Sequence, residues 1–224
     1  MEIRVLVTPQ ERLLFSNRLS QARAQFGCGY KGVSRGPVDN EERLRAATLL
    51  GLFSRPDDPV EAMLAGMSIH DLQTFPQSCA DPDLSHLPPS STFECGDHWA
   101  LTRGAGMQMW RAAAIYIAHR KPAAVLAYLA VSPAAHAGFY AAMGFRPVGR
   151  IQPYQYLETS EGNPVVQGMV LDGEPLRKLI DAAVHLPADR TASGITRFNN
   201  SGRLRQAAPP VERPNSSDIL QKAA

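Results

Sequence analysis

The stretch "SPAAHAGFYAAMGFRPVGR" (residues 132–150) predicts a short helix and the turn that ends it. Ser132 is expected at the N-cap, where a hydroxyl oxygen accepts hydrogen bonds from the free N–H groups of the first turn, and Pro133 at the first helical position. Gly144 is expected to end the helix in the left-handed conformation. The stretch therefore predicts a helix of about three turns, with Tyr140 close to its end.

Three segments before this helix predict a strand, a glycine-rich turn with a helix, and a buried strand. They are "TFECGDHWAL" (92–101), "TRGAGMQMWRAAAIYIAHRK" (102–121) and "PAAVLAYLAV" (122–131). The last is apolar at every position, as expected of a strand buried on both faces. In the middle segment one helix face carries Met107, Trp110, Ala114 and Ile117.

The remaining segments predict alternating strands and helices. They are a strand at "EIRVLV" (2–7), a helix capped by Thr8 that ends at Gly27, a loop over 27–45 with a short helix at "NEERLR", a hairpin of "AATLLGLFS" and "EAMLAGMSIHDL", an irregular segment over 73–91, a hairpin of "RPVGRIQPYQYLE" and "NPVVQGMVLD", and a closing helix at "GEPLRKLIDAAVHL". This order predicts an α/β (α+β) fold.

The length of 224 residues predicts one substantial domain. We assign residues 1–186 to it, and residues 187–224 to a polar, proline-rich and flexible C-terminal tail.

The net charge of +2 disfavours nucleic acid as a partner. No run approaches the roughly 20 apolar residues of a membrane span, and the three cysteines form no CxxC pair, which predicts a cytoplasmic protein.

Two blocks, "ECGDHWALTRGAGMQMW" and "AAVLAYLAVSPAAHAGFYAAMGFRPVG", resemble the GNAT superfamily of N-acyltransferases. The resemblance extends over residues 1 to about 172 and is most specific in the second block. It implies a mixed, mainly antiparallel central sheet flanked by helices on both faces. It also implies transfer of an acyl group from a pantetheine thioester, acyl-CoA or acyl-carrier protein, to a primary amine. No residue cluster has metal-ligand spacing, so no metal is proposed.

The glycine-rich turn predicts a phosphate-binding site, because unpaired N–H groups and the helix dipole favour anions at a helix N-terminus. Its residues are Leu101, Thr102, Arg103, Gly104, Ala105 and Gly106. The family usually has Arg or Gln where Leu101 stands, and Arg103 could compensate in part. Pro133 also stands where an asparagine is common. A plain tight turn is the alternative interpretation.

Tyr140 and Glu94 are the candidate catalytic residues. The resemblance implies that Tyr140 donates a proton to the departing thiolate; the alternative is that it only packs in the core. An ammonium must lose a proton before it attacks a thioester, and we assign Glu94 as this base, acting directly or through water. Strand alternation predicts Glu94 and His98 on one face and Asp97 on the other. We expect His98 and Cys95 to have no catalytic role.

The motifs "TFEC" and "LQTFPQS" resemble N-acyl amino acid synthases and acyl-homoserine-lactone synthases, which accept acyl chains from acyl carrier protein. Gly96 and Asp97 replace the Ser-Arg pair usual in that subgroup. An acetyl-CoA-dependent acetyltransferase is the alternative among enzymes. A second alternative is a catalytically inactive module that binds acyl thioesters or proteins. A small-molecule amine is the expected partner, and acyl carrier protein and a homodimer are weighed beside it.

Overall fold

The structure is a computed structural model that describes residues 2–25, 28–30, 40–75, 82–131, 137–154, 157–159, 162, 164–184 and 195–196. The helices are α1 (Pro9–Gln25), α2 (Asn40–Ala46), α3 (Ala105–Ala118), α4 (Ala137–Ala142) and α5 (Gly173–Val184), with short 3-10 turns at Val60–Ala62, Pro82–Leu84 and Pro89–Ser91. The strands are β1 (Glu2–Leu6), β2 (Cys28–Tyr30), β3 (Thr48–Phe53), β4 (Ala65–Asp71), β5 (Thr92–Ala100), β6 (Ala124–Ala130), β7 (Arg146–Pro153), β8 (Leu157–Thr159), β9 (Val165–Asp172) and β10 (Ile195–Thr196).

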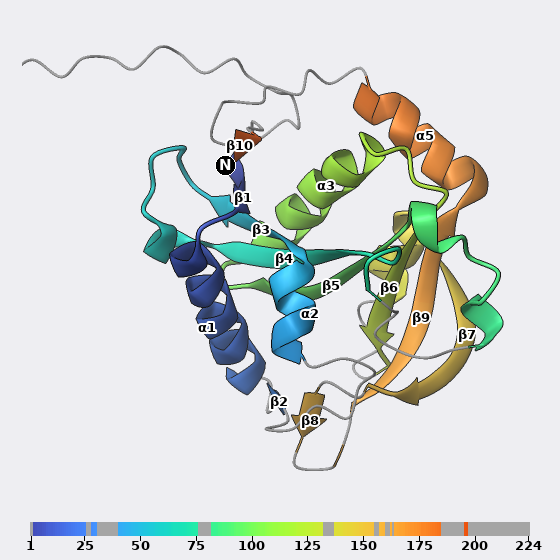
Figure 1. The fold of residues 1–224 in the computed structure, drawn as a ribbon, viewed down its shortest axis with the longest axis horizontal. Helices are drawn as coiled ribbons and strands as arrows, with labels where there is room; N and C mark the ends of the chain where they lie inside the picture. The colour runs from blue at the N-terminus through green and yellow to red at the C-terminus, as the bar shows by residue number, and fades with distance from the viewer. Residues whose placement is uncertain are drawn as a thin grey trace, which may run out of the picture.

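The central sheet has eight strands in the order β10-β1-β3-β4-β5-β6-β9-β7 (Figure 1). Among the described residues, β5 and β6 are the one parallel pair, and every other pair in this sheet is antiparallel. Helix α3 connects β5 to β6, as a parallel pair requires. The mixed, mainly antiparallel sheet predicted from the sequence is confirmed.

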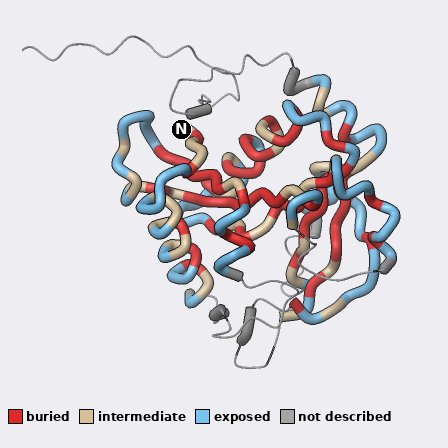
Figure 2. Tube along the Cα trace, viewed as in Figure 1, coloured by how far each residue is buried: buried red, intermediate tan, exposed pale blue. Residues whose placement is uncertain are grey.

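Helices cover both faces of the sheet. On one face α1 and α2 pack against it in a cluster that includes Phe15, Leu44 and Trp99. On the other face α3, α4 and α5 pack in a larger cluster that includes Met109, Tyr140 and Leu176. Figure 1 shows α1 and α2 on the opposite side of the sheet from α3 and α5, and Figure 2 shows that the buried residues follow the strands between them.

The N-terminus of α1 is fixed by a reciprocal cap. The amide of Glu11 donates to Thr8 Oγ1 at 3.2 Å, and the amide of Thr8 donates to the Glu11 carboxylate at 2.9 Å. Such a capping box satisfies donors that the first helical turn leaves unpaired. The predicted cap at Thr8 is confirmed.

Gly144 has a φ of +90°, as predicted for the residue that ends α4. A Cβ at this position would lie 2.8 Å from Pro175 Cβ, so a side chain would clash as well as strain the backbone. The predicted cap of the same helix, Ser132 and Pro133, lies outside the described residues.

Two predicted segments differ in the structure. Cys28–Tyr30, expected to belong to a loop, forms β2 and pairs antiparallel with β8. The strand expected to run from residue 146 to 158 ends at Pro153, and Leu157–Thr159 joins the separate β2–β8 ribbon. Both differences come from a long-range pairing that no local pattern signals. Within the predicted tail, Ile195–Thr196 pairs with β1.

Candidate active site

Strands β5 and β6 separate part-way along their length. Their parallel register runs from Thr92 opposite Ala124 to Cys95 opposite Ala127. Both strands continue beyond this point, β5 to Ala100 and β6 to Ala130, without a described pair between them. The sheet is therefore open between β5 and β6, and we call this opening the splay.

A β-bulge in β5 lies at the start of the splay. Trp99 pairs with Gly66 and Gly96 with Ser68 of β4, so Asp97 and His98 together oppose a single β4 residue. Asp97 has a φ of 47°, a left-handed conformation that is unusual for a residue other than glycine. A bulge re-aims the side chains that follow it.

The bulge overturns the predicted strand alternation. Glu94 and Asp97 lie on the same face of β5, and both contact the guanidinium of Arg43 in α2. His98 lies on the opposite face, where its ring is 6.1 Å from that of Trp110. The extra residue in the bulge shifts the side-chain period by one, so Asp97 joins the face of Glu94 and His98 leaves it.

Five buried polar residues form the cluster around Arg43, each with at most 4% of its surface exposed. They are Arg43, Ser68, His70, Glu94 and Asp97, which we call the buried polar cluster. Arg43 donates to Asp97 Oδ2 and to His70 Nε2, the latter at 2.8 Å, and its Nη1 lies 3.7 Å from Glu94 Oε1. Ser68 Oγ donates to Asp97 Oδ2 at 2.8 Å.

Opposing effects act on the pKa values in this cluster. Burial alone would raise the pKa of Asp97, but the charge of Arg43 outweighs it and holds that pKa well below its usual range. Burial, and then the Arg43 charge, lower the pKa of His70. The cluster at neutral pH therefore contains a charged Asp97 and a neutral His70.

Tyr140 lies on the opposite face from Glu94, in an aromatic group. Its ring is 5.3 Å from Trp110, 5.7 Å from Phe139 and 5.4 Å from Phe145, each in an edge arrangement. Burial is the main cause that raises the pKa of Tyr140 above its usual range, and Cys95 adds to it. The phenol is therefore a hydrogen-bond donor at all physiological pH values.

The glycine-rich turn lies at the N-terminus of α3 and is exposed from Leu101 to Gly104. Gly104 has a φ of 82°, and a Cβ there would meet no atom within 4 Å, so the space above it is open. Within the described part of the chain, the amides of Thr102, Arg103 and Gly104 donate no hydrogen bond. These amides could therefore hold an anion.

Two other amides of the turn already donate hydrogen bonds within the protein. The Leu101 amide donates to Leu64 O at 2.9 Å, and the Ala105 amide donates to Thr102 O at 3.2 Å. Gly106 lies over His98, whose Cε1 would be 3.0 Å from a Cβ at position 106. The amides of Leu101 and Ala105 therefore already donate to protein carbonyls, and the phosphate-binding role of the turn stays a prediction.

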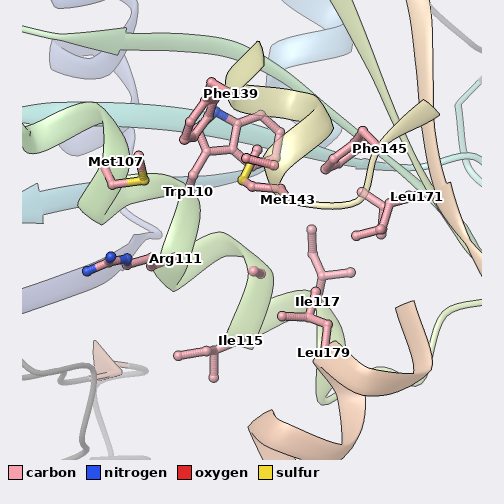
Figure 3. A pocket seen from close by; sticks show the side chains of 13 residues that line it. Met107, Trp110, Arg111, Ile115, Ile117, Phe139, Met143, Phe145, Leu171 and Leu179 are labelled. Atoms are coloured by element: carbon pink, nitrogen blue, oxygen red, sulfur yellow. The ribbon is translucent and has the colours of Figure 1, made fainter. Parts of the chain in front are cut away.

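A cavity of about 510 Å³ opens between α3, α4 and α5 on the face of Tyr140. Its lining residues are Met107, Trp110, Arg111, Ala114, Ile115, Ile117, Val125, Phe139, Ala142, Met143, Phe145, Leu171 and Leu179. Figure 3 shows Phe139 of α4, and Met143 just after this helix, facing α3, with Leu179 of α5 at the far end and Arg111 directed away from the apolar side chains. The four helix-face residues predicted from the sequence all line this cavity.

The aromatic group connects Tyr140 to the cavity. Trp110, Phe139 and Phe145 each contact the Tyr140 ring and also line the cavity wall. A ligand that entered the splay beside Tyr140 could therefore continue into an apolar space.

The sequence prediction missed most of the buried polar cluster, including Arg43, Ser68 and His70. Arg43 stands among other charged residues in "NEERLRA", and nothing in the local pattern marks it as buried. Ser68 and His70 carried a signal: two polar residues at alternate positions of an otherwise apolar strand share one face. Tyr154 also lies near the cluster, with burial as the main cause that raises its pKa.

Two tryptophans and one cysteine near the candidate site are part of the protein core. Trp99 and Trp110 are buried. Cys95 is buried, and burial raises the pKa of its thiol, which makes it a poor nucleophile.

The described residues contain no group of three or more His, Cys, Asp or Glu side chains that could hold a metal ion. In the same part of the chain, every helix is too short or too polar to cross a membrane.

The splayed parallel pair, the turn before α3 and the mainly antiparallel sheet define the class of fold: the chain has the GNAT fold of N-acyltransferases. FeeM, an N-acyl amino acid synthase from uncultured soil microbes, is similar with a TM-score of 0.57 and 16% identity, over 83% of this chain and 97% of its own. TofI, solved in a ternary complex with an inhibitor and MTA, has a TM-score of 0.51 and 15% identity, over 81% and 97%.

A further similar structure is yncA from Salmonella typhimurium, solved with its cofactor acetyl-CoA. It has a TM-score of 0.51 and 14% identity, over 77% of this chain and 93% of its own. No protein-family model matches the chain, and no curated protein matches it in sequence.

Proposed function

We propose that this protein is an N-acyltransferase that moves an acyl group from a pantetheine thioester to a primary amine. One observation carries the proposal: Glu94 and Tyr140 lie on opposite faces of the sheet, and the splay is the opening that connects these faces. A thioester inserted in the splay would have a carboxylate on one side and a phenol on the other. These are the two groups that aminolysis of a thioester needs.

The reaction follows from this placement. Glu94 accepts a proton from the acceptor ammonium, directly or through water, and the amine attacks the thioester carbonyl carbon. The carbon–sulfur bond breaks, and Tyr140 donates its phenolic proton to the departing sulfur. The attacking nitrogen releases its second proton to water as the amide forms, and water returns a proton to the Tyr140 phenolate. The free amides of Thr102, Arg103 and Gly104 would bind the phosphate of the donor, since a helix N-terminus favours negative charge.

The apolar cavity supports a donor with an acyl chain longer than acetyl. Its walls are almost entirely apolar, and burial of each CH2 group contributes about 0.8 kcal/mol. An acetyl group would leave this space unfilled. We therefore propose that the acyl chain passes Tyr140 and lies along α3 between α4 and α5, which is consistent with either acyl-CoA or an acyl-carrier protein as donor.

Free-thiol release tests the activity directly. Purified protein is mixed with a pool of primary amines and with dodecanoyl-CoA, dodecanoyl-carrier protein or acetyl-CoA as donor. We expect thiol release that depends on the amine, with a dodecanoyl amide detected by mass spectrometry. Binding of all three donors without amine-dependent thiol release would contradict the proposal and indicate a thioester-binding module.

The cavity assignment predicts the effect of Ala114→Phe. A phenyl group at this lining position fills the cavity, so we expect kcat/KM for dodecanoyl-CoA to fall about 10-fold or more, which corresponds to roughly 1.4 kcal/mol of lost burial. Activity with acetyl-CoA should be unchanged. The matched control is Gln108→Phe, on the same helix but not in the cavity lining. Equal losses with both donors would contradict the assignment.

The base assignment predicts a shifted pH profile for Glu94→Gln. Without the carboxylate the acceptor must reach the site already deprotonated, so we expect turnover to require a higher pH. The measurement is the rate of thiol release from about pH 6 to about pH 9, at a donor concentration that saturates the enzyme. A variant profile that coincides with the parent profile would contradict the role of Glu94.

A further inference from the structure

The guanidinium of Arg43 stands between two buried carboxylates, those of Glu94 and Asp97. Its Nη2 donates to Asp97 Oδ2, and its Nη1 donates to His70 Nε2 at 2.8 Å. The distance from Nη1 to Glu94 Oε1 is 3.7 Å, which is longer than a hydrogen bond. The guanidinium is therefore bonded to Asp97 and His70, while it lies close to Glu94 without this contact.

A small movement would bring Arg43 into hydrogen-bond contact with Glu94. A hydrogen bond from N–H to oxygen is about 3 Å long, so the missing distance is below about 1 Å. Gly96 places no side chain beside this gap, and a Cβ there would lie 3.7 Å from Arg43 Nη1 and 3.9 Å from Glu94 Oε1. The contacts with Asp97 and His70 are therefore what hold the guanidinium away from Glu94.

The backbone of the bulge does not by itself require a carboxylate at residue 97. Its φ of 47° is left-handed, a conformation that glycine adopts without strain and asparagine tolerates. The Asp97 carboxylate accepts hydrogen bonds from Arg43 and, at 2.8 Å, from Ser68 Oγ. The bulge turns it to the face of Glu94, which regular strand alternation would not do. The backbone conformation alone thus does not account for a negative charge at this position.

Several titratable groups lie within electrostatic reach of Glu94. They are Arg43 of α2, His70 of β4, Tyr154 of β7, and Cys95 and Asp97 of its own strand. The imidazole is neutral, and burial keeps the phenol and the thiol protonated. Arg43 and Asp97 are the charged members of this group at neutral pH, with Arg23 Nη2 3.8 Å from Asp97 Oδ1. How readily Glu94 binds a proton therefore depends on how Arg43 is shared between the two carboxylates.

We propose that Asp97 is a positioning residue, which holds Arg43 away from Glu94 so that Glu94 keeps its ability to accept a proton from the acceptor amine. The inference rests on the acyltransferase function proposed above, in which Glu94 is the base. A carboxylate that accepts hydrogen bonds from a guanidinium binds a proton less readily. The charge of Asp97 acts in the same direction, because a neighbouring negative charge favours the protonated form of a carboxylic acid.

Asp97→Asn tests this role without disturbing the bulge, because asparagine tolerates the left-handed backbone and keeps an oxygen for Arg43 and Ser68. Loss of the negative charge lets Arg43 pair with Glu94, which makes Glu94 a weaker base. With the primary-amine pool and saturating dodecanoyl-CoA, we expect the rate of thiol release to fall about 10-fold, the value of roughly one charge-assisted hydrogen bond. The acid side of the pH–rate profile should move to lower pH, because a weaker base loses its proton at lower pH.

Asp71→Asn is the matched control. Asp71 ends the neighbouring strand β4, and its carboxylate accepts from the Gln73 amide at 2.9 Å instead. We expect this variant to keep the rate and the pH profile of the parent. An Asp97→Asn rate and profile equal to those of the parent would overturn the proposal. A lower rate without movement of the acid side would also overturn it, because a merely structural role predicts that result.

Urea unfolding at about pH 7 tests the placement of Arg43 without turnover. We compare the parent, Glu94→Gln, Asp97→Asn and the double variant. Since Arg43 pairs with Glu94 once Asp97 is neutral, Glu94→Gln should lower the urea midpoint more in the Asp97→Asn background than in the parent. Equal shifts in both backgrounds would contradict the proposal. If the parent releases no thiol but the shifts differ as expected, the acyltransferase function fails, and the pairing of Arg43 with Asp97 in preference to Glu94 stands.

Discussion

Tyr140→Phe is expected to lower kcat by about 10²- to 10⁴-fold, the usual contribution of a general acid. The substitution removes only the hydroxyl, and the ring contacts with Trp110, Phe139 and Phe145 remain. The KM for the thioester donor should therefore change little. The measurement is amine-dependent thiol release at saturating donor.

The pH dependence of the Tyr140→Phe variant distinguishes a catalytic role of Tyr140 from a structural one. Burial raises the pKa of Tyr140, so the phenol stays protonated and the loss should be the same from about pH 6 to about pH 9. Tyr116→Phe is the matched control, because Tyr116 lies on α3 and contacts Thr48 and Arg120 instead. A Tyr140→Phe rate equal to the parent rate would leave Tyr140 with a packing role only.

Arg43→Ala is expected to lower the free energy of unfolding by about 3–5 kcal/mol, since removal of one partner from a buried ion pair leaves uncompensated charge. Asp97 and Glu94 are both buried and both depend on this guanidinium. The measurement is urea unfolding at about pH 7. Arg45→Ala, two residues on in the same helix, is the control: its side chain is 71% exposed, and we expect a loss below about 0.5 kcal/mol.

The free energy of unfolding lost in Arg43→Ala should be smaller at acidic pH. In the parent the folded pKa of Asp97 lies below its unfolded value, so its contribution is complete above about pH 4 and falls away below it. Without Arg43, burial dominates and the folded pKa rises above the unfolded value, so the variant loses stability as the pH increases. The difference between parent and variant should therefore be smaller at about pH 4.5 than at about pH 7. A constant difference would show that Asp97 is not the affected group.

Local sequence patterns were sufficient to predict most of the helices and strands. The cap at Thr8, the hairpin of β3 and β4, the α3 helix and the glycine at position 144 follow from interactions between residues close in the sequence. The β2–β8 ribbon was missed because it joins segments more than 120 residues apart, and only a folded chain brings them together.

The sequence by itself determined the order of elements, the short helix that carries Tyr140, and the glycine-rich turn before α3, because propensity, capping and left-handed glycines act over a few residues. Tertiary structure decided which side chains meet. The bulge at Asp97 turned this carboxylate toward Arg43, and the packing of α2 brought that arginine under β5. Burial and charge pairing depend on residues far apart in the chain, so they emerge only when the sheet and its helices are assembled.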